Sequence, residues 1–134
     1  MAFPDANGLL IGYLSPLLAP VKVASRVPDP RPVRLVQVRR VGGAATAPVR
    51  DTARVDFFVW DIDDRAAMQL ALTVRGHLWA LSGTQLLGVP CYRVQEFLGP
   101  RLDDDPVTNV PRVWMTYSFD LRADDAIQPA PTFR

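Results

Sequence analysis

The chain has 134 residues, a length that fits one domain with one hydrophobic core. Hydrophobic residues make up 49% and charged residues 22%, which excludes wholesale disorder, and a net charge of +1 argues against a protein built mainly to neutralise a phosphate backbone. The single cysteine, Cys91, excludes an internal disulfide bond and a zinc site of several cysteines. We therefore expect a soluble protein made in the cytoplasm.

The N-terminal third predicts a helix, a short strand and a stiff connector. Apolar residues recur at three- and four-residue spacing from Asp5 to Leu18, and Pro16 predicts that the helix ends near Ser15. The apolar run has no preceding Lys or Arg and is too short to span a bilayer, so neither a signal peptide nor a membrane helix is expected. Val21–Val27 predicts a strand, and prolines at every second position from 28 to 32 then impose an extended backbone.

The next part of the chain predicts two strands joined into a long hairpin arm. Val33–Val41 alternates, and Gly42-Gly43 is expected to end this strand. Ala53–Trp60 alternates more clearly between apolar and polar side chains. The loop between them, Gly42 to Thr52, is longer than usual hairpin loops, and such loops often carry function.

The clearest predicted helix follows the hairpin. One of Asp61, Asp63 and Asp64 is expected to cap its start, because acidic residues are favoured at a helix N-terminus. Its body runs from about Asp63 to Leu81 with one continuous apolar stripe, and Ser82-Gly83 stops it.

Two further strands complete the predicted domain. Val89–Leu98 is the first, the turn-rich stretch Arg101–Asn109 follows, and Pro111–Leu121 is the second. The element order predicts an α+β fold, in which a long helix and an N-terminal helix pack on a single layer of about five mostly antiparallel strands. The expected domain spans residues 1–122, and residues 123–134 are expected to form a flexible tail.

No set of residues predicts catalysis or metal binding. His77 has no second ligand at metal-binding spacing, and Cys91 has only His77 as a candidate base. Asp103–Asp105, followed by Pro106, is more typical of a solvated turn than of a cation loop. We expect a non-enzymatic protein without a cofactor. The alternative is a small ligand-binding or enzyme domain with a pocket around His77 and Cys91.

Three aromatic residues lie on the polar faces of their strands. Phe58 and Trp60 share one such face, and Trp114 lies opposite the apolar face of the last strand. They belong either to a protein–protein interface or to a second core layer under helices that cover both faces of the sheet. Core packing is the better explanation for Trp60 and Trp114, and both explanations stay open for Phe58.

Several short segments follow one another in a characteristic order after the N-terminal helix. They are Val27-Pro28-Asp29-Pro30-Arg31-Pro32, Arg39-Arg40-Val41-Gly42-Gly43, Val59-Trp60, Ala66-Ala67, Val74-Arg75, Tyr92-Arg93-Val94, Gly99-Pro100, Asp105-Pro106 and Pro111-Arg112-Val113. Their order and spacing, over roughly residues 3 to 122, resemble the tail terminator (tail completion) proteins of siphophages that infect actinobacteria.

The resemblance implies a structural protein of the virion with no catalytic residues. Its subunits would form a homo-hexameric ring on the last ring of the tail tube, stop tube polymerisation, and join the tail to the head. The implied partners are the chain itself, the major tail tube protein and the head–tail connector, with no membrane and no sequence-specific nucleic acid. The implied place is the head-proximal end of the tail. The alternative is another neck, head–tail joining or minor tail protein.

A closed ring needs head-to-tail contacts between different surfaces of each subunit. The loop Gly42–Thr52 is the first candidate to reach a neighbour or the tube, and Arg101–Asn109 is the second. An acidic patch on one subunit can meet arginines on the next. The candidate interface residues are therefore Arg39, Arg40, Arg50, Asp51, Phe58, Asp103, Asp104 and Asp105.

Overall fold

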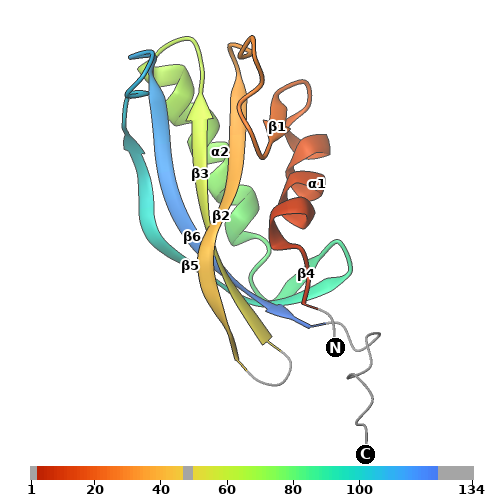
Figure 1. Cartoon of the computed structure of the whole chain (residues 1–134). Coiled ribbons are helices and arrows are strands. Elements are labelled where there is room, and N and C mark those ends of the chain that lie inside the picture. The colour runs from red at the N-terminus through yellow and green to blue at the C-terminus, as the bar shows by residue number, and fades with distance from the viewer. Residues whose placement is uncertain (1–2, 47–49, 124–134) are drawn as a thin grey trace, which may run out of the picture.

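The computed structural model describes residues 3–46 and 50–123, which form two helices and one six-stranded sheet (Figure 1). The helices are α1 (Ala6–Leu18) and α2 (Asp64–Trp79). The strands are β1 (Lys22–Ala24), β2 (Leu35–Thr46), β3 (Arg50–Trp60), β4 (Thr84–Leu86), β5 (Val89–Leu102) and β6 (Arg112–Arg122). Their order in the sheet is β1-β2-β3-β6-β5-β4, with β1 parallel to β2 and the other neighbours antiparallel. The predicted α+β class is confirmed, with six strands in place of about five.

Helix α1 is anchored by its cap and by a buried leucine stripe. The Asp5 carboxylate accepts a hydrogen bond from the Gly8 N–H at 3.1 Å, and Leu10, Leu14 and Leu18 are buried at four-residue spacing. The predicted end near Ser15 is wrong, because the helix continues through Pro16 to Leu18. Pro16 lies in the last turn, so it removes a single helical hydrogen bond there, and the burial of Leu18 offsets that loss.

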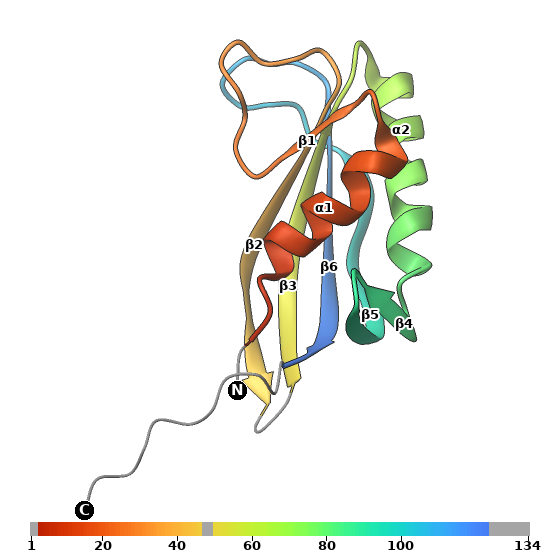
Figure 2. The same ribbon diagram turned by 90° about the vertical axis from the view of Figure 1, so that its right-hand side faces the viewer.

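Strands β2 and β3 are longer than predicted, and they form an arm that runs past the ends of both helices (Figures 1 and 2). The prediction of a loop over Gly42–Thr52 is wrong, because the described part of this segment belongs to β2 and β3. Residues 47–49 lie outside the described residues. The two glycines do not end β2, because they follow a β-bulge at Val41 and remain paired with β3. Gly43 has a φ of +106°, and a Cβ there would stand 1.9 Å from the Thr52 carbonyl oxygen.

Helix α2 follows its prediction closely. The Asp63 carboxylate accepts a hydrogen bond from the Ala66 N–H at 2.8 Å and caps the helix. The apolar stripe is buried along its whole length, through Ala67, Leu70, Ala71, Val74 and Leu78.

The C-terminal half contains a small strand that was not predicted and a longer one than expected. β4 pairs with the start of β5 through the two-residue turn Leu87-Gly88, in which both residues have positive φ. β5 runs through Gly99-Pro100 to Leu102, beyond the predicted end at Leu98. Shifts in its register against β6 on both sides of Leu98 absorb the irregular backbone, so the strand continues.

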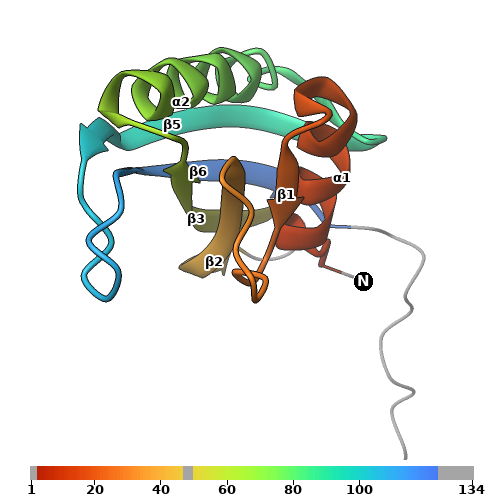
Figure 3. The same cartoon turned by 90° about the horizontal axis from the view of Figure 1, so that it is seen from above.

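The core lies between the helices and one face of the sheet (Figure 3). The Phe57 ring meets the Tyr117 ring edge-on at 6.0 Å, and the Tyr117 hydroxyl donates a hydrogen bond to the Glu96 carboxylate. Arg75 of α2 pairs with Glu96 at 2.9 Å, which joins α2 to β5 and, through Tyr117, to β6. No helix of the described residues covers the opposite side of the sheet, which we term the outer face. Neither described helix is long and apolar enough to cross a membrane.

Candidate assembly surfaces

Aromatic rings and arginines stack on one another across the outer face. Phe58 on β3 and Trp114 on β6 are register partners, and their rings stack with centroids 5.9 Å apart and an interplanar angle of 16°. The Arg112 guanidinium lies 4.7 Å from the centre of the Phe58 ring, and that of Arg101 lies 4.3 Å from the Trp114 ring. These cation–π contacts join β3, β6 and β5 on one surface.

The same pattern continues toward the arm. The Arg54 guanidinium lies 4.2 Å from the Phe97 ring centre, and that of Arg50 lies 4.6 Å from the Tyr92 ring. Each arginine reaches over β6, because β6 lies between β3 and β5. Phe97 is 49% exposed and Tyr92 is 41% exposed. A groove of about 360 Å³ runs along this surface, lined by Val41, Arg54, Asp56, Phe97, Leu98, Trp114 and Thr116.

We term this surface the arginine–aromatic face, defined by Arg50, Arg54, Phe58, Tyr92, Phe97, Arg101, Arg112 and Trp114. The sequence predicted Phe58 and Arg50 as interface residues, and it placed Trp114 on the polar face of its strand but favoured core packing for it. Arg101 fell within the second candidate loop, yet it lies on β5, because that strand is longer than predicted. Arg54 could have been predicted as well, because it alternates onto the same face of its strand as Phe58.

The three aromatic residues of uncertain role have different surroundings. Trp60 is 1% exposed, as expected for a core residue, with Arg112 and Arg31 over its ring. Phe58 and Trp114 are half-buried on the outer face. The prediction that helices on both faces of the sheet bury Phe58 and Trp114 in a second core layer is therefore wrong. Both α1 and α2 lie on the same side of the sheet.

Two of the candidate interface charges pair inside the subunit. The Arg40 guanidinium donates two hydrogen bonds to the Asp51 carboxylate, at 2.7 and 2.8 Å, and Asp51 is 3% exposed. The hydrogen bond to Asp51 raises the pKa of Arg40. The Arg40 N–H also donates to the Asn7 side chain at 2.8 Å, so this point of the arm is tied to α1. Arg39 donates to the Ser25 carbonyl oxygen at 3.4 Å.

The acidic loop between β5 and β6 is held together by two of its aspartates. Arg112 donates to the Asp103 carboxylate at 2.8 Å, and the Asp105 carboxylate accepts from the N–H groups of Val107 (2.9 Å) and Thr108 (3.4 Å). Burial alone would raise the pKa of Asp105, but these backbone hydrogen bonds outweigh it and the pKa is lowered. Asp104 is exposed. Within residues 3–46 and 50–123, no cluster of three or more His, Cys, Asp or Glu side chains is arranged to hold a metal ion.

Cys91 is buried in β5, and the backbone of His77 helps to join the two helices. Cys91 is 1% exposed, and burial raises the pKa of its thiol to about 11, which keeps it protonated and weakly nucleophilic near neutral pH. The His77 carbonyl oxygen accepts a hydrogen bond from the Tyr13 hydroxyl at 2.9 Å and so ties α2 to α1. Burial raises the pKa of that tyrosine.

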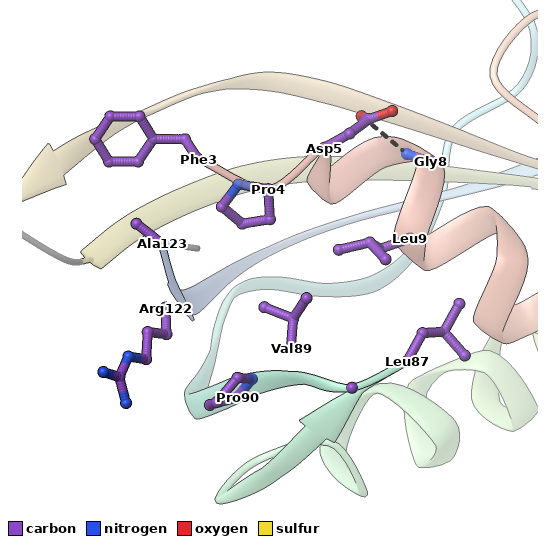
Figure 4. Close-up of a pocket in the computed structure, with 11 residues that line it drawn as sticks. Phe3, Pro4, Asp5, Gly8, Leu9, Leu87, Val89, Pro90, Arg122 and Ala123 are labelled. Atoms are coloured by element: carbon purple, nitrogen blue, oxygen red, sulfur yellow. Dashed lines mark hydrogen bonds between the residues drawn. The ribbon is translucent and has the colours of Figure 1, made fainter. Parts of the chain in front are cut away.

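A larger groove lies where the two ends of the described chain meet (Figure 4). It has a volume of about 760 Å³, and we term it the terminal groove. Its walls are the start of α1, the β4–β5 turn and the end of β6. The lining residues are Phe3, Pro4, Asp5, Gly8, Leu9, Leu87, Gly88, Val89, Pro90, Arg122 and Ala123. Neither His77 nor Cys91 is among them.

Comparison with known protein families identifies the class of protein that carries these surfaces. The sequence model of a family described as phage tail termination protein matches residues 2–127. The chain belongs to this family. The match confirms the predicted membership of the phage tail terminator family, whose proteins are structural components of the phage tail rather than enzymes. No curated protein matches the chain at a significant level.

A tail termination protein works through contacts with other tail components, so its surfaces replace the active site of an enzyme. The described residues form three candidate contact surfaces: the arm, the arginine–aromatic face and the terminal groove. The first two hold Arg39, Arg40, Arg50, Asp51 and Phe58 of the predicted set. The remaining candidates, Asp103 to Asp105, lie on the loop that joins β5 to β6.

Proposed function

We propose that this tail termination protein assembles into a homo-hexameric ring at the head-proximal end of a siphophage tail tube. The ring sits on the last ring of tube subunits and blocks the addition of another. Its opposite surface receives the head–tail connector. The observation that carries the proposal is the family match over nearly the whole chain.

The shape of the subunit supports closure into a ring. A ring that closes by rotation uses two different surfaces of each subunit, and the arm and the arginine–aromatic face differ in shape and chemistry. Arginine and aromatic side chains are enriched at the centres of protein interfaces. A guanidinium that stacks on a ring still presents N–H groups at its edge, so Arg50 and Arg54 suit carboxylates of a partner.

The contacts within the subunit divide the eight candidate residues into two groups. Arg40, Asp51, Asp103 and Asp105 form the ion pairs and turn hydrogen bonds that fix the arm and the acidic loop. We assign them a positioning role. Arg50, Phe58 and Asp104 are the proposed direct contacts, and Arg39 joins them at the side of the arm next to Ser25.

The test combines solution mass with electron microscopy of tube ends. Purified protein is measured alone and after mixing with purified tail tubes, and tube lengths are followed while free tube subunits are supplied. We expect a cap at one end of the tube and no further growth at that end. A protein that stays monomeric and leaves tube ends bare and growing would overturn the proposal. Binding to heads alone would favour the alternative of a head–tail joining protein.

A further inference from the structure

The terminal groove is also where the described chain stops. Ala123 is 2% exposed, and it lines the groove together with Arg122. The next eleven residues of the sequence, 124–134, therefore leave from the wall of the groove. An apolar groove of about 760 Å³ thus has a stretch of peptide attached at its edge.

Leu87 gives this groove an unusual apolar wall. It occupies the first position of a two-residue hairpin turn with a φ of +47°, where Asn or Gly is preferred and a leucine is strained. Its side chain is 56% exposed and lies against Gly12 of α1, where a Cβ would be 3.0 Å from the Leu87 Cδ1 atom. The turn thus places an apolar side chain at the groove, and more than half of its surface is open to a further apolar contact.

The sequence of residues 124–134, Asp-Asp-Ala-Ile-Gln-Pro-Ala-Pro-Thr-Phe-Arg, matches the chemistry of the groove. Ile127 and Phe133 supply apolar side chains. Two prolines favour an extended backbone, which lowers the entropy lost on docking into a groove. The charges are complementary as well, because the segment begins with two aspartates beside Arg122 and ends with Arg134, while Asp5 stands on the opposite side of the groove (Figure 4).

We propose that residues 124–134 dock into the terminal groove of their own chain, with Ile127 and Phe133 packed over Leu87. Attachment at Ala123 favours the chain's own groove, because a short tether gives an effective concentration in the millimolar range. The inference concerns the free subunit and does not depend on ring formation.

The direct test separates the segment from its groove. A chain that ends at Ala123 is mixed with a fluorescent peptide of residues 124–134, and binding is followed by fluorescence anisotropy. We expect saturable binding to the shortened chain and at least about tenfold weaker binding to the full chain, whose own segment competes. Absence of saturable binding to the shortened chain, or equal binding to both chains, would overturn the proposal.

A matched pair of variants locates the peptide on the protein. In the shortened chain, Leu87→Asn suits the turn and preserves folding, yet it removes the apolar wall, so peptide binding should weaken about tenfold. Val107→Asn changes a 90% exposed residue outside the groove and should leave binding unchanged. A peptide carrying Phe133→Ala should also bind more weakly. Equal binding by the Leu87 variant and the Val107 control would count against the groove.

Solution mass decides whether residues 124–134 dock in the groove of their own chain or in that of a neighbouring subunit. If each segment docks in its own groove, removal of residues 124–134 leaves the number of subunits per particle unchanged. A shortened chain that forms a smaller particle than the full chain would show that the segment reaches a neighbour, and this would overturn docking within one chain.

Discussion

The ion pair of Arg40 with Asp51 combines a half-exposed arginine with a buried carboxylate. The two side chains are 33% and 4% exposed. The pair itself contributes only modestly to the free energy of folding, because both charged groups lose bound water when they meet. Loss of one partner is more damaging, since the remaining charge stays in a site that cannot solvate it. The arm therefore depends on the pair being complete.

We predict that Arg40→Ala lowers the free energy of unfolding by roughly 2–3 kcal/mol, because Asp51 is left buried and unpaired. Urea denaturation measures the change. Arg65→Ala, at an exposed position at the start of α2, is the control and should change stability by less than about 0.5 kcal/mol. Addition of Asp51→Ala to the Arg40 variant should recover part of the loss. Equal effects of the two single variants would contradict the prediction.

Two buried acids predict how stability depends on alkaline pH. Burial raises the pKa of Cys91 from 9.0 to about 11, and burial together with the hydrogen bond to Glu96 raises that of Tyr117. The unfolded chain thus releases these protons first, so stability is complete below about pH 9 and falls as the pH rises toward 11. We expect a lower urea midpoint at about pH 10.5 than at about pH 8, and a smaller drop in Cys91→Ala. A midpoint that does not change would refute this.

At the scale of elements, two glycines predict opposite outcomes for the same substitution. Gly43→Ala would place a Cβ 1.9 Å from the Thr52 carbonyl oxygen in the arm, whereas a Cβ at Gly76, within α2, meets nothing within 4 Å. We expect Gly43→Ala to destabilise the chain by more than about 2 kcal/mol, and Gly76→Ala to stabilise it by up to about 1 kcal/mol. Thermal unfolding of the two variants measures both effects. A Gly43→Ala variant as stable as the unmodified chain, or more stable, would show that the arm does not need glycine at this position.

The sequence predicted the bounds of an element well where the spacing of its apolar residues was regular along its whole length. Helix α2 was expected from Asp63 to Leu81 and runs from Asp64 to Trp79, because its apolar stripe and cap are local signals. β2 and β5 were predicted too short. Gly42-Gly43 in β2 and Gly99-Pro100 in β5 are sequences that normally mark the end of a strand. In the folded chain a neighbouring strand keeps both segments paired through register shifts, and that partner cannot be seen in a local pattern.

The candidate surfaces were predictable only in part, for the same reason. Phe58 and Trp114 stood out because an aromatic residue on the polar face of a strand breaks the alternation. Their stacking on each other, and the arginines over both rings, could not be predicted, because these residues come from different strands and meet only through the order of the sheet. Leu87 carried no local signal, since its positive φ follows from the pairing of β4 with β5.

At the scale of the whole molecule, the helices occupy one side of the sheet and the arginine–aromatic face the other. Arg50 lies in the arm and stacks on Tyr92, so it combines the two proposed contact surfaces. We predict that Arg50→Glu prevents ring formation and tube capping while the unfolding temperature changes little, because the stacked pair contributes only about 0.5–1 kcal/mol at an exposed site. Mass measurement and electron microscopy test this. Arg65→Glu, on α2, is the matched control, and normal capping by Arg50→Glu would remove that residue from the interface.

The meeting of the two ends of the described chain at one groove has a consequence for engineering. Phe3 and Ala123 share its wall, so a short linker in place of residues 1–2 and 124–134 can join them, and a circular permutant can be opened elsewhere. The acidic loop is the natural opening, because Val107 at its exposed tip is 90% accessible to solvent. A permutant that begins at Thr108 should keep the sheet intact and move both new ends to the far end of the molecule. Reporter groups could then be attached at either end of the subunit.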